Sequence, residues 1–299
     1  MTATESHHAI DAVWRIESAK LIAGLTRMTR DVGIAEDLAQ EALIAALEQW
    51  PRDGIPEKPG AWLMAAAKNR TIDMFRRNAL QTRKHEELAR DEDARQMTMD
   101  DVDAAFNAPL DDAIGDDMLR LIFVSCHPVL GMEARVALTL KLLGGLSTDE
   151  IARAFLAAEP AIAQRIVRAK RALRDAKVPY EVPRGAQLAV RLASVLEVVY
   201  LIFNEGYSAT AGDDWMRPQL CEEALRLGRI LAGLAPLEPE VHGLVALMEI
   251  QASRLHARTT PDGAPVLLMD QDRARWDHLL IQRGLAALAR AERLSPAQG

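Results

Sequence analysis

Aromatic residues, cysteines and long apolar runs are all scarce in this sequence. Phe, Trp and Tyr make up 4% of the 299 residues, and the two cysteines, Cys126 and Cys221, lie far apart with no CxxC motif. This spacing argues against a disulfide framework and a zinc site, so we expect two buried thiols. No apolar run reaches the about 18 residues of a membrane span, and no secretory signal begins the chain. These absences predict a cytoplasmic protein without membrane contact.

Signatures of catalysis are missing as well. The sequence contains no phosphate-binding loop, no metal-ligand spacing and no arrangement of a nucleophile with a base. Cys126 and His127 are adjacent, but neighbouring residues on a helix point in different directions and no acid is placed to orient the pair. We therefore expect no enzyme, no cofactor and no metal.

What the chain has instead is helix-forming composition. Ala, Leu, Arg and Glu recur, and no stretch alternates apolar and polar residues for long. With 49% hydrophobic residues the chain can bury a sizeable core, and its length suggests two or three units. The predicted fold class is all-α.

Charge is distributed unevenly around the formal net value of -7. Residues 61–90 hold seven basic and three acidic side chains, and residues 161–177 hold six basic and one acidic. Between them, residues 91–118 hold ten acids and one Arg. An average charge hides such local basic surfaces, which are the usual footprint of nucleic-acid binding.

The acidic stretch and a Pro-rich connector divide the chain. Residues 91–116 have weak periodicity and many like charges, which predicts a linker. The connector "KVPYEVPRG" contains Pro179 and Pro183 and ends the second basic helix. We expect a helical domain over 1–90, a second domain over 117–178 and a third over 185–299.

The first domain is predicted to present one acidic and one basic helix. In the helix over 31–50, ended by Pro51, Leu47 is expected to face inward and four polar residues outward: Glu36, Asp37, Gln40 and Glu41. After the loop 52–58, "PGAWLMAAAKNRTIDMFRR" forms a helix with an apolar first half and a basic outward second half.

The second domain carries signals for a helix-turn-helix. Ser147 followed by Glu150 is a capping box, and Pro160 lies in the first turn of the next helix. A short helix followed by a longer basic one is the motif whose second helix enters the DNA major groove.

The segments "DVGIAEDLAQEALIAAL", "PGAWLMAAAKNRTIDMFRR" and "GLSTDEIARAFLAAEPAIAQRIVRAKRALR" together resemble regions two and four of extracytoplasmic-function (ECF) sigma factors of bacterial RNA polymerase. The resemblance spans residues 10–177 and implies an all-α pair of sigma domains joined by an acidic linker. It implies that the clamp helices of the largest subunit of core RNA polymerase bind Asp37, Gln40 and Glu41. The opened minus-ten element of promoter DNA would meet Lys68, Asn69, Arg70, Asp73, Arg76 and Arg77, with the loop 52–58 holding a flipped base.

For the minus-thirty-five element, the resemblance points to the second basic helix, through Gln164, Arg165, Arg168, Lys170 and Arg171. We expect Gln164, Arg165 and Arg168 to reach the bases, and the last two residues the phosphates. The turn departs from the family pattern, because Leu156 stands where many relatives have Gly, and Ala161 and Ala163 occupy early recognition positions. We therefore expect few side chains of this helix to contact base edges.

The third part has no counterpart in a minimal sigma factor. Residues 217–234 and 240–258 resemble a tetratricopeptide-type hairpin, and 272–294 the first half of another. Some ECF subgroups carry such an extension, so we expect a piece of a longer protein. The segment "IFNEGYSAT" is interpreted as an inter-helix loop. The short connector lets the extension pack on the second domain and regulate it.

Two other functional classes stay open at this point. A stand-alone helix-turn-helix regulator would bind a duplex operator as a dimer without polymerase. A helical-repeat interaction scaffold would bind proteins through the third part. The pairing of "DLAQE" with "KNRTIDMFRR" favours the sigma factor, because neither alternative needs an N-terminal domain of that pattern.

Overall fold

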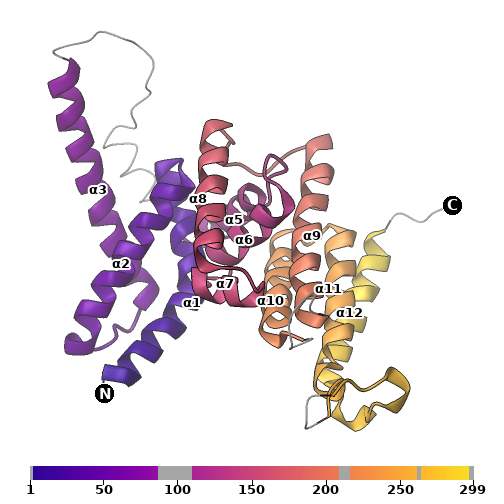
Figure 1. Ribbon diagram of the computed structural model, residues 1–299. Helices are drawn as coiled ribbons and strands as arrows, with labels where there is room; N and C mark the ends of the chain where they lie inside the picture. The colour runs from indigo at the N-terminus through magenta and orange to yellow at the C-terminus, as the bar shows by residue number, and fades with distance from the viewer. Residues whose placement is uncertain (1–2, 87–109, 209–215, 261–263, 296–299) are drawn as a thin grey trace. The chain divides into compact units, whose positions relative to one another are not determined.

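The computed structural model describes residues 3–86, 110–208, 216–260 and 264–295. These residues form α-helices and short 3-10 turns with a single isolated β-bridge, between Thr259 and Pro265, so the all-α prediction is confirmed. The chain divides into two compact units (Figure 1). Unit 1 comprises residues 1–124 with 173–181, and unit 2 comprises residues 125–172 with 182–299.

Unit 1 is built on three helices that pack pairwise: α1 (Ala3–Thr29), α2 (Val32–Asp53) and α3 (Pro59–Glu86). Asp31 starts α2, because its carboxylate accepts hydrogen bonds from the backbone N–H groups of Gly33 and Ile34 at 2.7 and 3.0 Å. Pro51 does not end α2 as predicted. It lies in the last turn, and the helix stops only at Gly54, whose φ of 87° leaves helical space.

Burial in unit 1 corrects two predicted orientations. Glu36 was expected outward, yet it is buried and accepts a hydrogen bond from Gln40 at 2.9 Å. Leu47 was expected inward and is 37% exposed. The buried face of α2 consists largely of alanines, at positions 35, 39, 42, 45 and 46.

The helix α5 (Leu110–Ser125) begins seven residues earlier than Asp117, where the sequence placed its start. Most of the predicted acidic linker, residues 91–109, lies outside the described residues. The end of that linker is therefore helical. The helix α5 up to Val124 and the segment 173–181 complete unit 1.

Unit 2 contains the helix-turn-helix and the C-terminal helices. α6 (Met132–Leu142) precedes α7 (Thr148–Ala154) and α8 (Glu159–Asp175), whose last residues belong to unit 1. The predicted capping box is present: Ser147 Oγ accepts from Glu150 N–H at 3.1 Å, and the Glu150 carboxylate accepts from Ser147 N–H at 2.8 Å. Local chemistry thus sets the start of α7.

The C-terminal helices are α9 (Ala186–Tyr207), α10 (Pro218–Leu234), α11 (Pro239–Ala252) and α12 (His278–Leu294). Neighbouring helices in this series pack together, and α9 also contacts α6 and α11. The segment "IFNEGYSAT" is not the predicted loop, because α9 continues through Tyr207. Gly206 permits a close crossing with α10 rather than a turn, since a Cβ there would lie 2.6 Å from Cys221 N.

Helix α9 is also the one described helix long and apolar enough to cross a membrane, with a hydropathy of 1.7 over an 18-residue window. This is weak evidence, because the core helix of a globular protein passes the same test. In unit 2 its Ser194, Val198 and Ile202 are buried against other helices.

Candidate nucleic-acid and polymerase interface

The predicted polymerase-binding residues form one exposed stripe on α2. Asp37, Gln40 and Glu41 are exposed, and one and two turns further along the same face lie Ile44 and Leu47, 52% and 37% exposed. Sequence reasoning missed Ile44 and placed Leu47 inward, although the spacing of four residues from Gln40 to Ile44 and three from Ile44 to Leu47 could have shown that they share this face. The stripe combines acidic and apolar groups, as protein-binding surfaces do.

The predicted minus-ten residues lie on α3, but they do not all face the same way. Asn69, Asp73 and Arg76 are exposed at spacings of four and three residues, so they share one face. Lys68 and Arg70 are half-buried at the flanks. Arg77 belongs to α3, but its side chain lies outside the described residues, as do all side chains from there to residue 115.

An ion pair joins these two faces. Arg70 Nη1 donates to Glu41 Oε2 at 2.7 Å, which links the helix assigned to polymerase with the helix assigned to DNA. The two side chains are 41% and 50% exposed to solvent, so the pair adds little to stability. The pair instead fixes where the two charges lie, because each side chain holds the other in place.

The loop that precedes α3 is exposed and held at both ends. Trp50, at its start, is buried and meets Trp62 edge to face, with 5.3 Å between ring centroids. Trp62 N–H also donates to Lys58 O at 3.1 Å. Between these contacts Arg52 is exposed in the last turn of α2, and Glu57 and Lys58 are exposed on the loop itself.

The helix α8 presents part of its predicted DNA surface to solvent. Gln164, Arg168 and Arg171 are exposed, whereas Arg165 and Lys170 are half-buried. Arg165 pairs with Glu133 at 2.6 Å, so the structure brings it to an acid of α6. Leu156 in the preceding turn has φ 48°, a left-handed conformation that favours Gly.

The two cysteine thiols belong to the packing rather than to this surface. Burial raises the pKa of Cys126 to about 11 and that of Cys221 to about 12, which keeps both thiols protonated. Among the described residues no three His, Cys, Asp or Glu side chains gather in a way that could hold a metal ion.

Family comparisons match the two motif-bearing parts of the chain. The family model described as sigma-70 region 2 matches residues 17–81, and that for sigma-70 region 4 matches residues 121–173. These two parts of the chain are thus similar to the two conserved regions of sigma-70 proteins. Residues 191–292 match a family of unknown function, DUF6596, which covers most of the C-terminal extension.

Two relatives are longer than the part of each that this chain matches. The chain is 44% identical over 274 residues to an uncharacterized protein of Rhizobium meliloti, a match that covers 91% of this chain and 63% of the relative. It is 27% identical over 191 residues to the probable ECF RNA polymerase sigma factor SigI of Mycobacterium tuberculosis, covering 63% of this chain and 62% of the relative. The chain thus spans less than two thirds of either relative. No solved structure matches it.

Proposed function

We propose that the chain acts as an ECF sigma factor, which binds core RNA polymerase and directs recognition and opening of promoters. The observation that carries the proposal is the presence of matches to regions 2 and 4 in one chain. Each match contains a helix that exposes polar and basic side chains three or four residues apart, on one face that could contact DNA. Because polymerase and promoter are intracellular, the proposed place of action is the cytoplasm. The name of the Mycobacterium relative supports the same assignment.

Region 2 serves the minus-ten element in this proposal. Asn69, Asp73 and Arg76 contact the opened strand, and the loop 52–58 receives an unstacked base. Basic groups supply affinity for phosphate, while captured bases supply selectivity. Binding the open strand more tightly than the duplex shifts the equilibrium towards opening, and no nucleotide hydrolysis is needed.

Region 4 serves the minus-thirty-five element through α8. Gln164 and Arg168 are the exposed candidates for base edges, and Arg171 for phosphate. Arg165 first has to leave its pair with Glu133, and the loss of this pair costs little because the Glu133 carboxylate is exposed to solvent. Arg165 therefore stays a candidate for base contact.

Polymerase binds the acidic and apolar stripe of α2. The matched test replaces Asp37 and Glu41 by their amides, Asp37→Asn with Glu41→Gln, because a Lys at position 41 would add a second cation beside Arg70. We expect weaker binding to core polymerase and an unchanged melting temperature. Glu292→Gln, an exposed acid on α12, is the control. Equal affinity of the double variant and the control would remove the assignment.

The decisive experiment is runoff transcription with purified core polymerase and a pool of genomic fragments. Arg76→Ala with Arg77→Ala should reduce open-complex formation and lower the salt slope by about one unit per lost phosphate contact. Arg153→Ala, which removes an exposed Arg of α7, is the control. Promoter-specific transcripts support the proposal. Tight binding to a duplex operator without polymerase would favour a stand-alone regulator, and neither activity would favour a repeat scaffold.

The extension is proposed to regulate region 4 through intramolecular contact. Ser194 of α9 donates to Cys126 O at 2.7 Å and accepts from Arg135 at 2.7 Å, within unit 2. Arg226 of α10 donates to Leu143 O. These contacts support a built-in regulator, because helices of the extension meet residues of the region 4 match.

A further inference from the structure

One large apolar side chain lies on the exposed face of α8, the helix proposed to enter the major groove. The other large apolar residues of α8, Ile162, Ile166 and Leu173, are buried. Val167 instead is 62% exposed. Sequence reasoning did not include Val167 among the residues expected to meet DNA, because only polar and basic side chains were considered for that surface.

Val167 shares its face with two of the polar residues that are proposed to contact DNA. Gln164 lies three residues before it and Arg171 four residues after it, and both are exposed. Residues three and four apart are neighbours on the surface of a helix. Val167 is therefore flanked by a candidate for base edges on one side and a candidate for phosphate on the other.

The stability of α8 gives no reason for a valine at this position. A largely exposed side chain removes little apolar area from water, and a β-branched residue has a lower helix propensity than Ala. A single exposed valine is ordinary on a protein surface. Its position between Gln164 and Arg171, rather than its exposure, gives it significance.

The major groove offers one apolar group that such a side chain can match. Each base pair presents donors and acceptors there, and thymine adds its C5-methyl group. A valine has no donor or acceptor, so the methyl group is its complement. Val167 lies about 4.5 Å beyond Gln164 along the helix axis, close to the roughly 3.4 Å between neighbouring base pairs. It would therefore reach the base pair beside the one that Gln164 reads.

We propose that Val167 is a specificity-determining residue of region 4, and that its side chain contacts the C5-methyl group of a thymine in the minus-thirty-five element. This inference rests on the proposed sigma-factor function. The contact removes the methyl group from water, which is worth about fourfold in affinity. Cytosine at the same place offers an amino donor that a valine cannot satisfy, so the contact also discriminates between the two pyrimidines.

The test uses the full chain bound to core polymerase and a promoter obtained from the genomic fragment pool. Each thymine of the upstream element is replaced in turn by uracil, which removes the methyl group and keeps every hydrogen-bonding group of the base. Val167→Ala shortens the side chain. The matched control is Val190→Ala, a valine of α9 that is 67% exposed. Both substitutions are on the surface and favour helix, so the melting temperature should not fall.

We expect one uracil position to weaken promoter binding by the unaltered chain about fourfold. Val167→Ala should lose about the same factor on the thymine template and lose nothing further with uracil at that position. Val190→Ala should respond to uracil as the unaltered chain does.

Two results would overturn the role of Val167 while leaving the sigma-factor function in place. One is promoter binding that no uracil affects, or that uracil weakens equally in Val167→Ala. The other is weaker binding of Val167→Ala to core polymerase without DNA, which would make this residue a protein contact. If the unaltered chain with core polymerase bound no promoter, the proposed function would fall, and the thymine contact with it.

Discussion

Gly206 offers a sharp test of the packing in the extension. It is buried near the end of α9, where a Cβ would lie 2.6 Å from Cys221 N, 2.9 Å from Arg217 O and 2.9 Å from Cys221 Sγ. Two of these atoms are backbone, so a methyl group can be accommodated only if the start of α10 moves. Arg217 N–H donates to Gly206 O at 2.7 Å, and that hydrogen bond would be strained by the movement.

The expected cost of Gly206→Ala is about 2 kcal/mol, the middle of the range for overpacking, even after the gain in helix propensity of up to about 1 kcal/mol. Gly243→Ala in α11 is the control, because a Cβ there meets nothing within 4 Å. That substitution should stabilise by about 0.5–1 kcal/mol. The same Gly-to-Ala change is thus expected to lower the stability at position 206 and to raise it at position 243.

Thermal unfolding of the full chain, followed by circular dichroism, measures both effects. For a unit of this size we expect a fall of about 4–8 °C for Gly206→Ala and a rise of about 1–3 °C for Gly243→Ala. A Gly206→Ala chain that melts with the unaltered protein would refute the close crossing of α9 and α10. A fall for Gly243→Ala would show that helix propensity does not decide the sign.

Three further predictions concern single side chains. Leu156→Gly should raise the melting temperature, by relieving a left-handed φ worth about 1 kcal/mol, whereas Leu156→Ala should not. Glu249→Gln should destabilise by about 1–3 kcal/mol in denaturant titration, because it breaks a buried carboxylate's two bonds to Arg229 at 2.7 and 3.0 Å. Desolvation lowers the pKa of His127 to about 4, and its Nδ1 accepts from Val129 N–H at 3.1 Å. Since the folded state holds this imidazole neutral, stability should fall as the pH drops from about 6.5 to 4, and His127→Gln should lose that part of the pH dependence.

Much of the helical architecture could be predicted because its signals are local. The capping box at Ser147 and Glu150, and Pro160 in the first turn of α8, act within one turn of the residues they order. The exposed stripe of Asp37, Gln40 and Glu41 likewise follows from helical periodicity. Such features need no knowledge of the tertiary fold.

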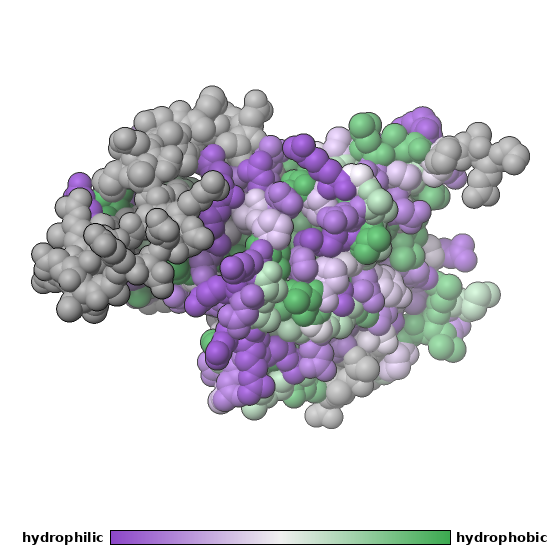
Figure 2. Space-filling model, turned by 90° about the horizontal axis from the view of Figure 1, so that it is seen from above, coloured by the Kyte–Doolittle hydropathy of each residue, from purple (hydrophilic) through white to green (hydrophobic). Residues whose placement is uncertain are grey.

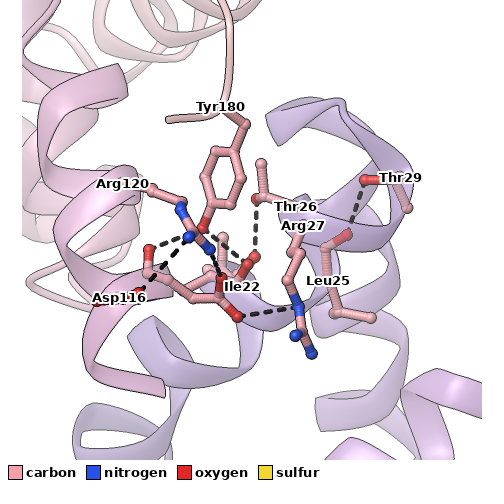
Figure 3. Close-up of polar contacts among 10 residues, drawn as sticks. Ile22, Leu25, Thr26, Arg27, Thr29, Asp116, Arg120 and Tyr180 are labelled. Atoms are coloured by element: carbon pink, nitrogen blue, oxygen red, sulfur yellow. Dashed lines mark hydrogen bonds and ion pairs between the residues drawn. The ribbon is translucent and has the colours of Figure 1, made fainter. Parts of the chain in front are cut away.

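The features that escaped prediction depend on distant partners. Tyr180 is buried, and its hydroxyl contacts the carbonyl oxygens of Ala23 and Asp117, 157 and 63 positions earlier, which no local pattern encodes (Figure 3). Glu36 is buried although acidic residues favour the surface, and "IFNEGY" is helical despite its Asn and Gly, because α9 needs Gly206 where it crosses α10. Tertiary packing overrides propensity at these positions.

On the visible face in Figure 2, apart from the atoms drawn grey, hydrophobic residues form separate patches among hydrophilic ones. The exposed apolar residues include Leu267, Met269 and Leu285 in unit 2. Scattered groups of this kind are ordinary on protein surfaces and need no ligand.

The hydrogen bonds between α9 and the region 4 helices bear on how such genes can be recombined. Ser194 accepts a hydrogen bond from Arg135 and donates one to the Cys126 carbonyl, and Arg226 donates one to the Leu143 carbonyl. A chimera that exchanged residues 121–173 alone would separate these partners. The exchanged region 4 would then have a surface that fits the α9 and α10 of its original chain and not those of the recipient. Region 4 and the extension should therefore be exchanged together between related proteins, and we expect the two to have been inherited as one unit.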